Sequence, residues 1–500
     1  MRRGLCAALP LGLAFALTLA LQACVTPAGL RAEQRRIDDA NKALGEKDWP
    51  RARVAVKAYL SARAFNHLSE NDQFGVLRMG ASVELKHGDK EVGYGYLLRA
   101  VQKAQAGKQE WLELIGYSAL LNHPADAPRG LVVLAQRWPD QIDLLHERVV
   151  GSALRSLHDL PPEQQLQASW NLYAANFTLK WGFQPDETWR DLCLLLLQNN
   201  RLSDAVEVSR RVTSPEVLIG MRADRRFDAM VAADPGHYDI ETAAKLDEKQ
   251  AQEISDAHPQ ILELKVHVAY TLLRLRDYGA MLAATDEVVS EIASTNFPQR
   301  LYSDFSDQYR RLLEARSTAL QRLARPEEAV KDQLAASRMT EEGLKNVSQV
   351  IDLAELYCQL NRPREALTAI GDLGALSDYG RMQLEGVRLR AARQLNDEAQ
   401  AARSMKFIAQ HRADSPLTYE HALVRGGQMD AAAQSLIARL LDPKQRQDAL
   451  RSVQDFPLVP GIDAEQDITV QWQALIARAD VQADVRKVGR AESYRIETFD

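Results

Sequence analysis

A short turn signature recurs along this chain, each time with a small residue five positions later. Gly or Asn at the turn accommodates the left-handed backbone conformation in which many helices end. A small residue at a fixed distance then lets a second helix cross the first closely. We call this small residue the crossing residue. The copies pair Asn361 with Ala366, Gly427 with Ala432, Asn200 with Ala205 and, more loosely, Gly88 with Gly93.

The rest of the chain has the pattern of an all-helical protein. Apolar residues recur at helical spacing almost throughout, alternating β-branched runs are nearly absent, and Gly and Pro fall mainly between helical segments. Two further copies keep the crossing residue without a Gly or Asn turn, at Ala52 and Ala329. In the last third, the predicted crossing residues lie 37, 33 and 33 residues apart, at Ala329, Ala366, Ala399 and Ala432. Proline is expected in the first turn of second helices, where its missing N–H costs nothing, at Pro50, Pro326 and Pro363.

These spacings are close to the 34-residue period of tetratricopeptide repeats (TPRs), and the chain resembles that superfamily. The family's small, aromatic, turn, small and large apolar positions are matched by Ala354, Tyr357, Asn361, Ala366 and Ile370, and its closing proline by Pro443. The resemblance is good over about residues 310–445 and patchy over 33–300, where the segment 240–257 does not fit a simple pair. It implies an all-α, TPR-like α-solenoid of helix-turn-helix repeats. An irregular helical array is the alternative.

The predicted organisation has five parts. Residues 456–461 cannot continue a helix because of their prolines, residues 470–488 form a helical pattern that could cap the solenoid, and residues 494–497 are too short to assign as a strand. The parts are a signal peptide at 1–23, a lipidated tether at 24–32, an irregular TPR-like array at 33–305, regular TPR-like repeats at 306–455, and a C-terminal loop, capping helix and tail at 456–500.

The N-terminus predicts export and lipidation. Arg2 and Arg3 precede a long apolar run that ends in Leu21-Gln22-Ala23-Cys24, and the run is short for a membrane span. An ordinary secretory signal is the main alternative. The segment resembles bacterial lipoprotein signals, although Gln22 is an unusual residue at its position. The resemblance implies acylation of Cys24 and, because Val25 follows, transport to the periplasmic face of the outer membrane.

Charge and cysteine content fit a periplasmic body. The formal net charge is -6, and it becomes -8 when Arg2 and Arg3 leave with the signal. A mildly acidic surface argues against nucleic-acid binding, which needs a basic stripe. Cys193 and Cys358 remain as free thiols in apolar helical patterns, where cysteine behaves as a small hydrophobe.

A set of aromatic residues interrupts the repeat pattern. Trp170, Tyr173, Phe177 and Trp181 follow one another at intervals of three and four, with Trp189 beyond. This spacing predicts one stripe on a single helix. We interpret the stripe as buried packing between repeat blocks. An exposed binding face is the alternative, and it would suit a carbohydrate or cell-wall ligand.

No sequence motif indicates catalysis. The chain lacks a P-loop, a G-x-S-x-G motif and cysteine pairs at metal spacing. We therefore predict no enzyme activity and no cofactor. The favoured function is a lipid-anchored scaffold that binds envelope proteins or peptides through a curved helical surface.

The docking groove is predicted in the regular repeats, at about residues 310–445. In proteins similar to TPRs, the first helix of each pair lines the groove, which here implies the segments 309–321, 351–359 and 381–393. The last segment supplies four arginines that favour an acidic partner, or that form an ordinary solvated face. They are Arg381, Arg388, Arg390 and Arg393.

Overall fold

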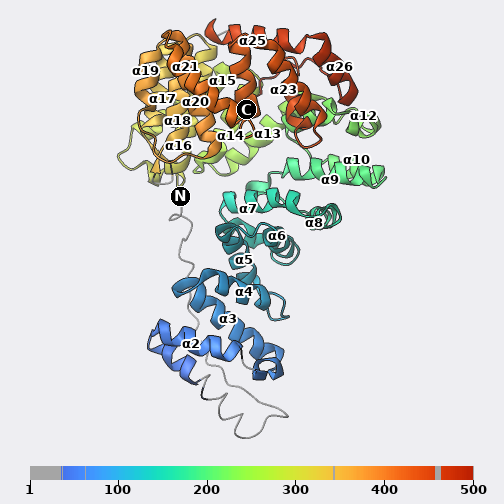
Figure 1. The fold of residues 1–500 in the computed structure, drawn as a ribbon, viewed down its shortest axis with the longest axis vertical. Coiled ribbons are helices and arrows are strands. Elements are labelled where there is room, and N and C mark those ends of the chain that lie inside the picture. The colour runs from blue at the N-terminus through green and yellow to red at the C-terminus, as the bar shows by residue number, and fades with distance from the viewer. Residues whose placement is uncertain (1–34, 36–37, 62, 342–343, 457–462, 499–500) are drawn as a thin grey trace. The chain divides into compact units, whose positions relative to one another are not determined.

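The structure, a computed structural model, describes residues 35, 38–61, 63–341, 344–456 and 463–498. Most of these residues are helical, and the predicted all-α class, built of helix-turn-helix pairs, is confirmed (Figure 1). The chain divides into two compact units, Met1–Arg201 and Leu202–Asp500, and each is described by itself. This division does not coincide with the predicted change of repeat regularity at residues 305 and 306, which stays a prediction.

The first unit is helical from residue 38 onward. Its elements after residues 38–45 are α2 (Trp49–Leu60), η1 (Arg63–His67), α3 (Glu70–His87), α4 (Lys90–Ala100), α5 (Lys108–Leu121), α6 (Asp126–Arg137), η2 (Pro139–Leu144), α7 (Glu147–Arg155), η3 (Ser156–Asp159), α8 (Pro162–Ala174), η4 (Lys180–Gly182) and α9 (Asp186–Gln198).

The second unit contains the more regular pairs and one two-residue hairpin. Its elements are α10 (Leu202–Ser209), α11 (Pro215–Ala223), η5 (Arg225–Phe227), α12 (Asp228–Ala233), α13 (Ile240–Ala257), α14 (Leu262–Arg274), α15 (Tyr278–Ala293), η6 (Pro298–Arg300), α16 (Phe305–Arg322), α17 (Pro326–Ser337), β1 (Thr340–Glu341), β2 (Leu344–Lys345), α18 (Val347–Gln359), α19 (Pro363–Ile370), α20 (Asp378–Gln394), α21 (Glu398–Gln410), α22 (Pro416–Arg425), α23 (Met429–Leu441), α24 (Arg446–Ser452), α25 (Asp463–Ile476) and α26 (Ala479–Val488).

The turn signature has the structure that the sequence predicts. Asn361, at the end of α18, adopts a left-handed conformation with φ 57°. The next N–H, of Arg362, donates to the carbonyl of Tyr357 at 2.8 Å, which is the Schellman closure of a helix end. Ala366 follows on α19 and is fully buried in the core that α18 and α19 share. The crossing residue therefore sets the close approach of the two helices.

The same spacing holds at turns without Gly or Asn. A left-handed conformation costs an ordinary residue about 1–2 kcal/mol, and the structure nevertheless uses it at Lys47, Arg276 and Ala324. Five positions after these turns stand fully buried residues. They are Ala52, Met281 and Ala329.

One predicted crossing residue is wrong. Ala399 is exposed, whereas Ala401 on the same helix is buried. The left-handed residue of this turn is Asn396, with φ 56°. Counting five residues from Asn396 gives Ala401, so the spacing rule holds and the error lay in overlooking the turn.

Proline has the predicted place in the second helices. Pro326 and Pro363 are the first residues of α17 and α19, and Pro50 lies in the first turn of α2. An N–H in the first turn of a helix has no intrahelical carbonyl to donate to, so proline loses no hydrogen bond at these positions.

Glycine brings helices of the first unit into close contact. A Cβ on Gly93 of α4 would lie 2.7 Å from the backbone nitrogen of Leu85 on α3. A Cβ on Gly130 of α6 would lie 2.6 Å from the side chain of Ile115 on α5. Gly93 is thus the crossing residue of its pair, as the looser sequence copy predicts. The turn part of that copy is wrong, because Gly88 has a φ of -140° and is not left-handed.

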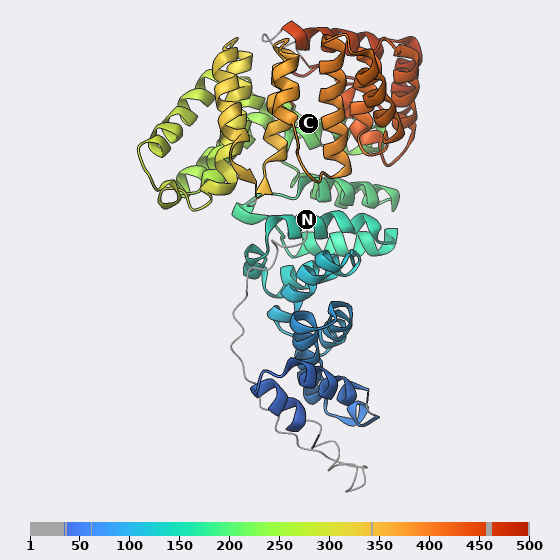
Figure 2. The same ribbon diagram turned by 60° about the vertical axis from the view of Figure 1, so that its left-hand side comes forward.

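The second unit stacks helical pairs from α14 to α23. The helices of residues 347–410, coloured orange, stand side by side in Figure 2. The long helix α13 packs against α14. A predicted single helix at 470–488 is wrong, because α25 ends at Ile476 and α26 begins at Ala479. Both helices pack against α23, and α25 also packs against α22.

The end of the second unit returns to its beginning. Helix α24 packs against α11, and Ala223 of α11 shares a core with Leu450 and Val488. A bridge joins Asp224 to Gly489. The second unit therefore closes on itself.

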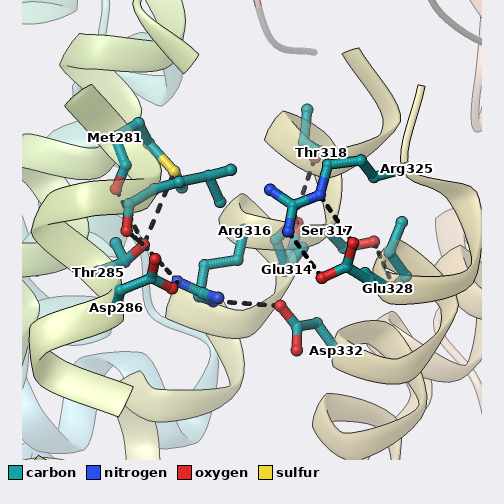
Figure 3. A network of polar contacts seen from close by, with 12 residues as sticks. Met281, Thr285, Asp286, Glu314, Arg316, Ser317, Thr318, Arg325, Glu328 and Asp332 are labelled. Carbon is teal, nitrogen blue, oxygen red and sulfur yellow. Dashed lines mark hydrogen bonds and ion pairs between the residues drawn. The ribbon is translucent and has the colours of Figure 1, made fainter. Parts of the chain in front are cut away.

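A buried arginine links three helices of the second unit. Arg316 of α16 lies 2.7 Å from Asp286 of α15 and 3.1 Å from Asp332 of α17, and it donates to the hydroxyl of Thr285 at 2.8 Å (Figure 3). Burial raises the pKa of Asp332, and the Arg316 charge opposes this rise. Arg316 thus fixes how two successive pairs stack.

Candidate protein-interaction site

The first helices of five successive pairs form one layer of the second unit, made of α14, α16, α18, α20 and α22. Contacts join α14 to α16, α18 to α20, and α20 to α22, and a hydrogen bond from Gln349 to Glu314 joins α18 to α16. We call this set of helices the first-helix layer. The three segments predicted to line the groove, 309–321, 351–359 and 381–393, lie on α16, α18 and α20.

Polar side chains cross the first-helix layer from helix to helix. Gln349 donates from Nε2 to Glu314 Oε2 at 2.8 Å and accepts from Arg310 Nη1 at 3.1 Å. On the next interface, Arg390 of α20 pairs with Glu355 of α18. The layer therefore presents a connected set of charged and amide groups.

Asp352 is the exception among these side chains. It is solvent-exposed, and within the described part of the chain no hydrogen bond or ion pair reaches its carboxylate. The surrounding helices displace enough water to disfavour its charge, and Glu314 and Glu355 add like charges. Together these effects raise the pKa of Asp352 to about 8. The layer thus holds an unsatisfied carboxylate beside two others.

Replacing Asp352 by Asn is expected to stabilise the protein at alkaline pH. The folded protein holds this proton more tightly than the unfolded chain, so wild-type stability falls as pH rises from about 4 to 8. Because the group is exposed, solvent screening limits the gain of Asp352→Asn to about 1 kcal/mol at pH 8. Urea midpoints at pH 4 and pH 8 measure it. A gain of equal size at both pH values would show that the carboxylate is not responsible.

The four predicted arginines do not share one free cationic face. Arg390 is buried and Arg381 is exposed. Burial lowers the pKa of Arg393, whose Nη1 donates to a backbone carbonyl. The neighbours differ for each arginine: Phe407 lies under Arg381 at 5.0 Å, Glu385 is 2.7 Å from Arg388, Glu355 pairs with Arg390, and the Ala422 carbonyl is 3.4 Å from Arg393.

The predicted aromatic stripe on one helix is wrong. Helix α8 ends at Ala174, so it carries Trp170 and Tyr173 alone. Phe177 is buried in the segment that follows, and Trp181 lies in η4 with a positive φ of 63°. The aromatic residues leave the helix because the chain turns after α8, which the spacing of rings could not reveal.

Several of these rings are packed against other side chains. Tyr173 meets Trp189, which is fully buried, edge to face with ring centroids 5.8 Å apart. The guanidinium of Arg201 lies over Trp170 at 4.4 Å, and the ammonium of Lys180 lies over Trp181 at 4.7 Å. A cation thus covers one face of each tryptophan ring. A sugar that stacks on the ring would need such a face to be open. The carbohydrate-binding alternative gains no support from this arrangement.

The cysteines divide between described and undescribed residues. Cys24, the predicted lipidation site, lies outside the residues that the structure describes. Cys193 and Cys358 are buried cysteines, and burial raises the pKa of each thiol. Within the described ranges, the helices are all too short or too polar to cross a membrane.

A row of polar and ring-bearing side chains along the first-helix layer has a signal in the sequence that the predictions did not use, although Asp352 and Glu314 lie outside this row. The position six residues before each left-handed turn residue is occupied by a polar or ring-bearing side chain on all five helices. Aligning the helices by their turns would have identified this row. Its members are Tyr270, Thr318, Glu355, Arg390 and His421.

Some solved structures are similar to this chain, all at low sequence identity where described below. No family model matches the chain, and no curated protein matches it. One similar solved structure is described as "Crystal structure of APC/C hetero-tetramer Cut9-Hcn1", with 12% identity over 91% of this chain and 96% of that chain and a TM-score of 0.28. Another, "Structure of Naa15/Naa10 bound to HypK-THB", matches at 12% identity over 81% of this chain and 68% of that chain, with a TM-score of 0.20. Such low scores define no shared helical path.

Proposed function

We propose that this protein is a lipid-anchored scaffold on the periplasmic face of the outer membrane that binds other envelope proteins or peptides. The observation that carries the binding role is the first-helix layer, a face of five helices with an unpaired carboxylate at Asp352. Solenoids commonly use such extended faces to hold partners. The proposal includes no catalytic role, cofactor or nucleic acid.

The chemistry of the layer favours a partner segment with a basic side chain. A lysine or arginine placed at Asp352 would relieve its repulsion with Glu314 and Glu355. An acidic partner, which the arginine pattern favours, would have to compete with the contacts that Arg388 and Arg390 already make. Arg381 is the arginine best exposed for such a partner.

A crosslinking pull-down from membranes tests the binding role. Asp352→Arg is expected to reduce recovery of a specific partner at least tenfold, whereas Glu365→Arg, on the exposed face of second helix α19, leaves recovery unchanged. Loss of the partner with Arg381→Glu instead would indicate an acidic partner. Equal recovery with all three variants would reject the first-helix layer as the binding surface.

The membrane role rests on the lipobox and is tested separately. Cys24→Ser is expected to leave an uncleaved precursor that incorporates no radioactive fatty acid, because the acylated thiol is gone. A Cys193→Ser variant, which changes a buried thiol of the body, serves as the control and should label normally. Undiminished labelling of Cys24→Ser would exclude lipidation at this residue.

A further inference from the structure

The C-terminal tail, residues 489–497, is held as an extended segment across helix ends of the second unit. The N–H of Arg490 donates to the carbonyl of Ala223, at the end of α11, at 2.9 Å. Near the other end of the tail, the N–H of Glu497 donates to the carbonyl of Arg274, at the end of α14, at 2.8 Å. The tail therefore uses carbonyls that the last turns of these helices leave open.

The middle of the tail is bound by the segment after α24. The N–H of Asp455 donates to the carbonyl of Glu492 at 2.9 Å, and the N–H of Tyr494 donates to the carbonyl of Asp455 at 3.0 Å. Tyr494 and Ile496 are buried between these contacts. Backbone pairing with alternate side chains buried is how extended peptides are commonly recognised.

Two carboxylates of the tail, five residues apart, are each bound by arginine. Glu492 pairs with Arg222 of α11. Glu497 is 6% exposed and accepts from Arg322 of α16 and from the hydroxyl of Tyr278, at 2.8 Å in both cases. We call the surface formed by these receiving residues the tail slot. It consists of Arg222, Ala223, Arg274, Tyr278, Arg322 and Asp455.

Three of the six slot residues, Arg274, Tyr278 and Arg322, lie on helices that have their own core. Helices α14, α15 and α16 share a buried cluster that includes Leu273, Met281 and Leu320, and no residue of the tail belongs to it. Because the tail follows the last turn of α26 and is not helical itself, it can leave this surface without unwinding a helix. The tail slot thus resembles a peptide-binding site that is filled by a segment of the same chain.

The tail enters the tail slot only because residue 489 is glycine. A Cβ at Gly489 would lie 2.1 Å from the carbonyl oxygen of Ala223, a separation that backbone atoms cannot tolerate. A larger residue at this position must lift the start of the tail from α11. Gly489 is therefore a position where the tail can be displaced without changing the slot that binds it.

We propose that the tail slot is a binding site for extended peptides that carry two spaced carboxylates, and that the protein's own tail is its dissociable occupant. The recognised segment carries two carboxylates five residues apart, with large apolar or aromatic side chains between them. A partner with this pattern binds by displacing the tail, which a short connection holds at high effective concentration.

The test measures binding of a fluorescent peptide, residues 489–498, to the full chain. Wild type is expected to bind weakly because its own tail occupies the slot, and Gly489→Val is expected to bind at least tenfold more tightly. Adding Arg322→Glu to Gly489→Val should weaken binding at least tenfold, and a peptide with Glu497→Arg should restore it. Arg300→Glu, an exposed arginine of η6, is the matched control and should change nothing.

Each remaining outcome contradicts the proposal. Undetectable binding to a folded Gly489→Val chain, or binding that Arg322→Glu leaves unchanged, would show that the slot does not recognise the segment. If circular dichroism shows that Gly489→Val does not fold, the binding measurement is made with a chain that ends at Val488. Failure of both to fold would make the tail an integral part of the fold. None of these results bears on partner recovery through Asp352, so this proposal and the scaffold role fail separately.

Discussion

Replacing Arg439 by alanine is expected to lower the free energy of unfolding by about 3–5 kcal/mol, because it leaves a buried carboxylate without its partner. Glu420 of α22 is fully buried, and Arg439 of α23 lies 2.7 Å from it with 9% of its side chain exposed. The hydroxyl of Ser435 also donates to Glu420, at 2.9 Å. Burial raises the pKa of Glu420, and the charge of Arg439 opposes that rise.

Urea unfolding at two pH values tests this prediction. Without Arg439, Glu420 gains a proton more readily, so the loss of stability should be smaller at pH 5 than at pH 8. Arg451→Ala is the control, since Arg451 pairs with the exposed carboxylate of Asp448; its effect should stay within about 0.5 kcal/mol. Equal losses for the two arginines would mean that the buried pair contributes no more than a surface pair. A double variant, Glu420→Gln with Arg439→Met, should recover most of the lost stability.

The local part of the fold could be predicted from the sequence because its causes are local. A left-handed residue ends the first helix, and a small residue five positions later lets the second helix pack closely against it. Asn361 and Ala366 are therefore enough to predict their helical pair from the sequence. The error at Ala399 shows the limit of using spacing between repeats. Repeat length varies, whereas the distance from turn to crossing residue does not, and Asn396 identifies Ala401 where the 33-residue period fails.

The contacts between distant segments could not be predicted in this way. Arg222 and Glu492 are 270 positions apart, and no helical period connects them. Their pairing depends on how far the second unit curves before its end meets α11. Asp352 was missed for a related reason, because its carboxylate is unusual only beside Glu314 on a neighbouring helix. Sequence identifies helical faces, and the stacking of helices decides which charges meet.

Where a left-handed residue joins the two helices of a pair, the residue five positions later sets the approach of those helices, and α21 allows this to be tested within one helix. Ala401 is buried among Met382, Leu389 and Ala422, whereas Ala399 is exposed two positions earlier. Ala401→Leu should destabilise by about 1–3 kcal/mol through overpacking, and Ala399→Leu by less than about 0.5 kcal/mol. Leu and Ala are both good helix formers, so helix propensity does not separate the variants. The urea midpoint is expected to fall only for Ala401→Leu. Equal midpoints for the two variants, or a larger fall for Ala399→Leu, would contradict it.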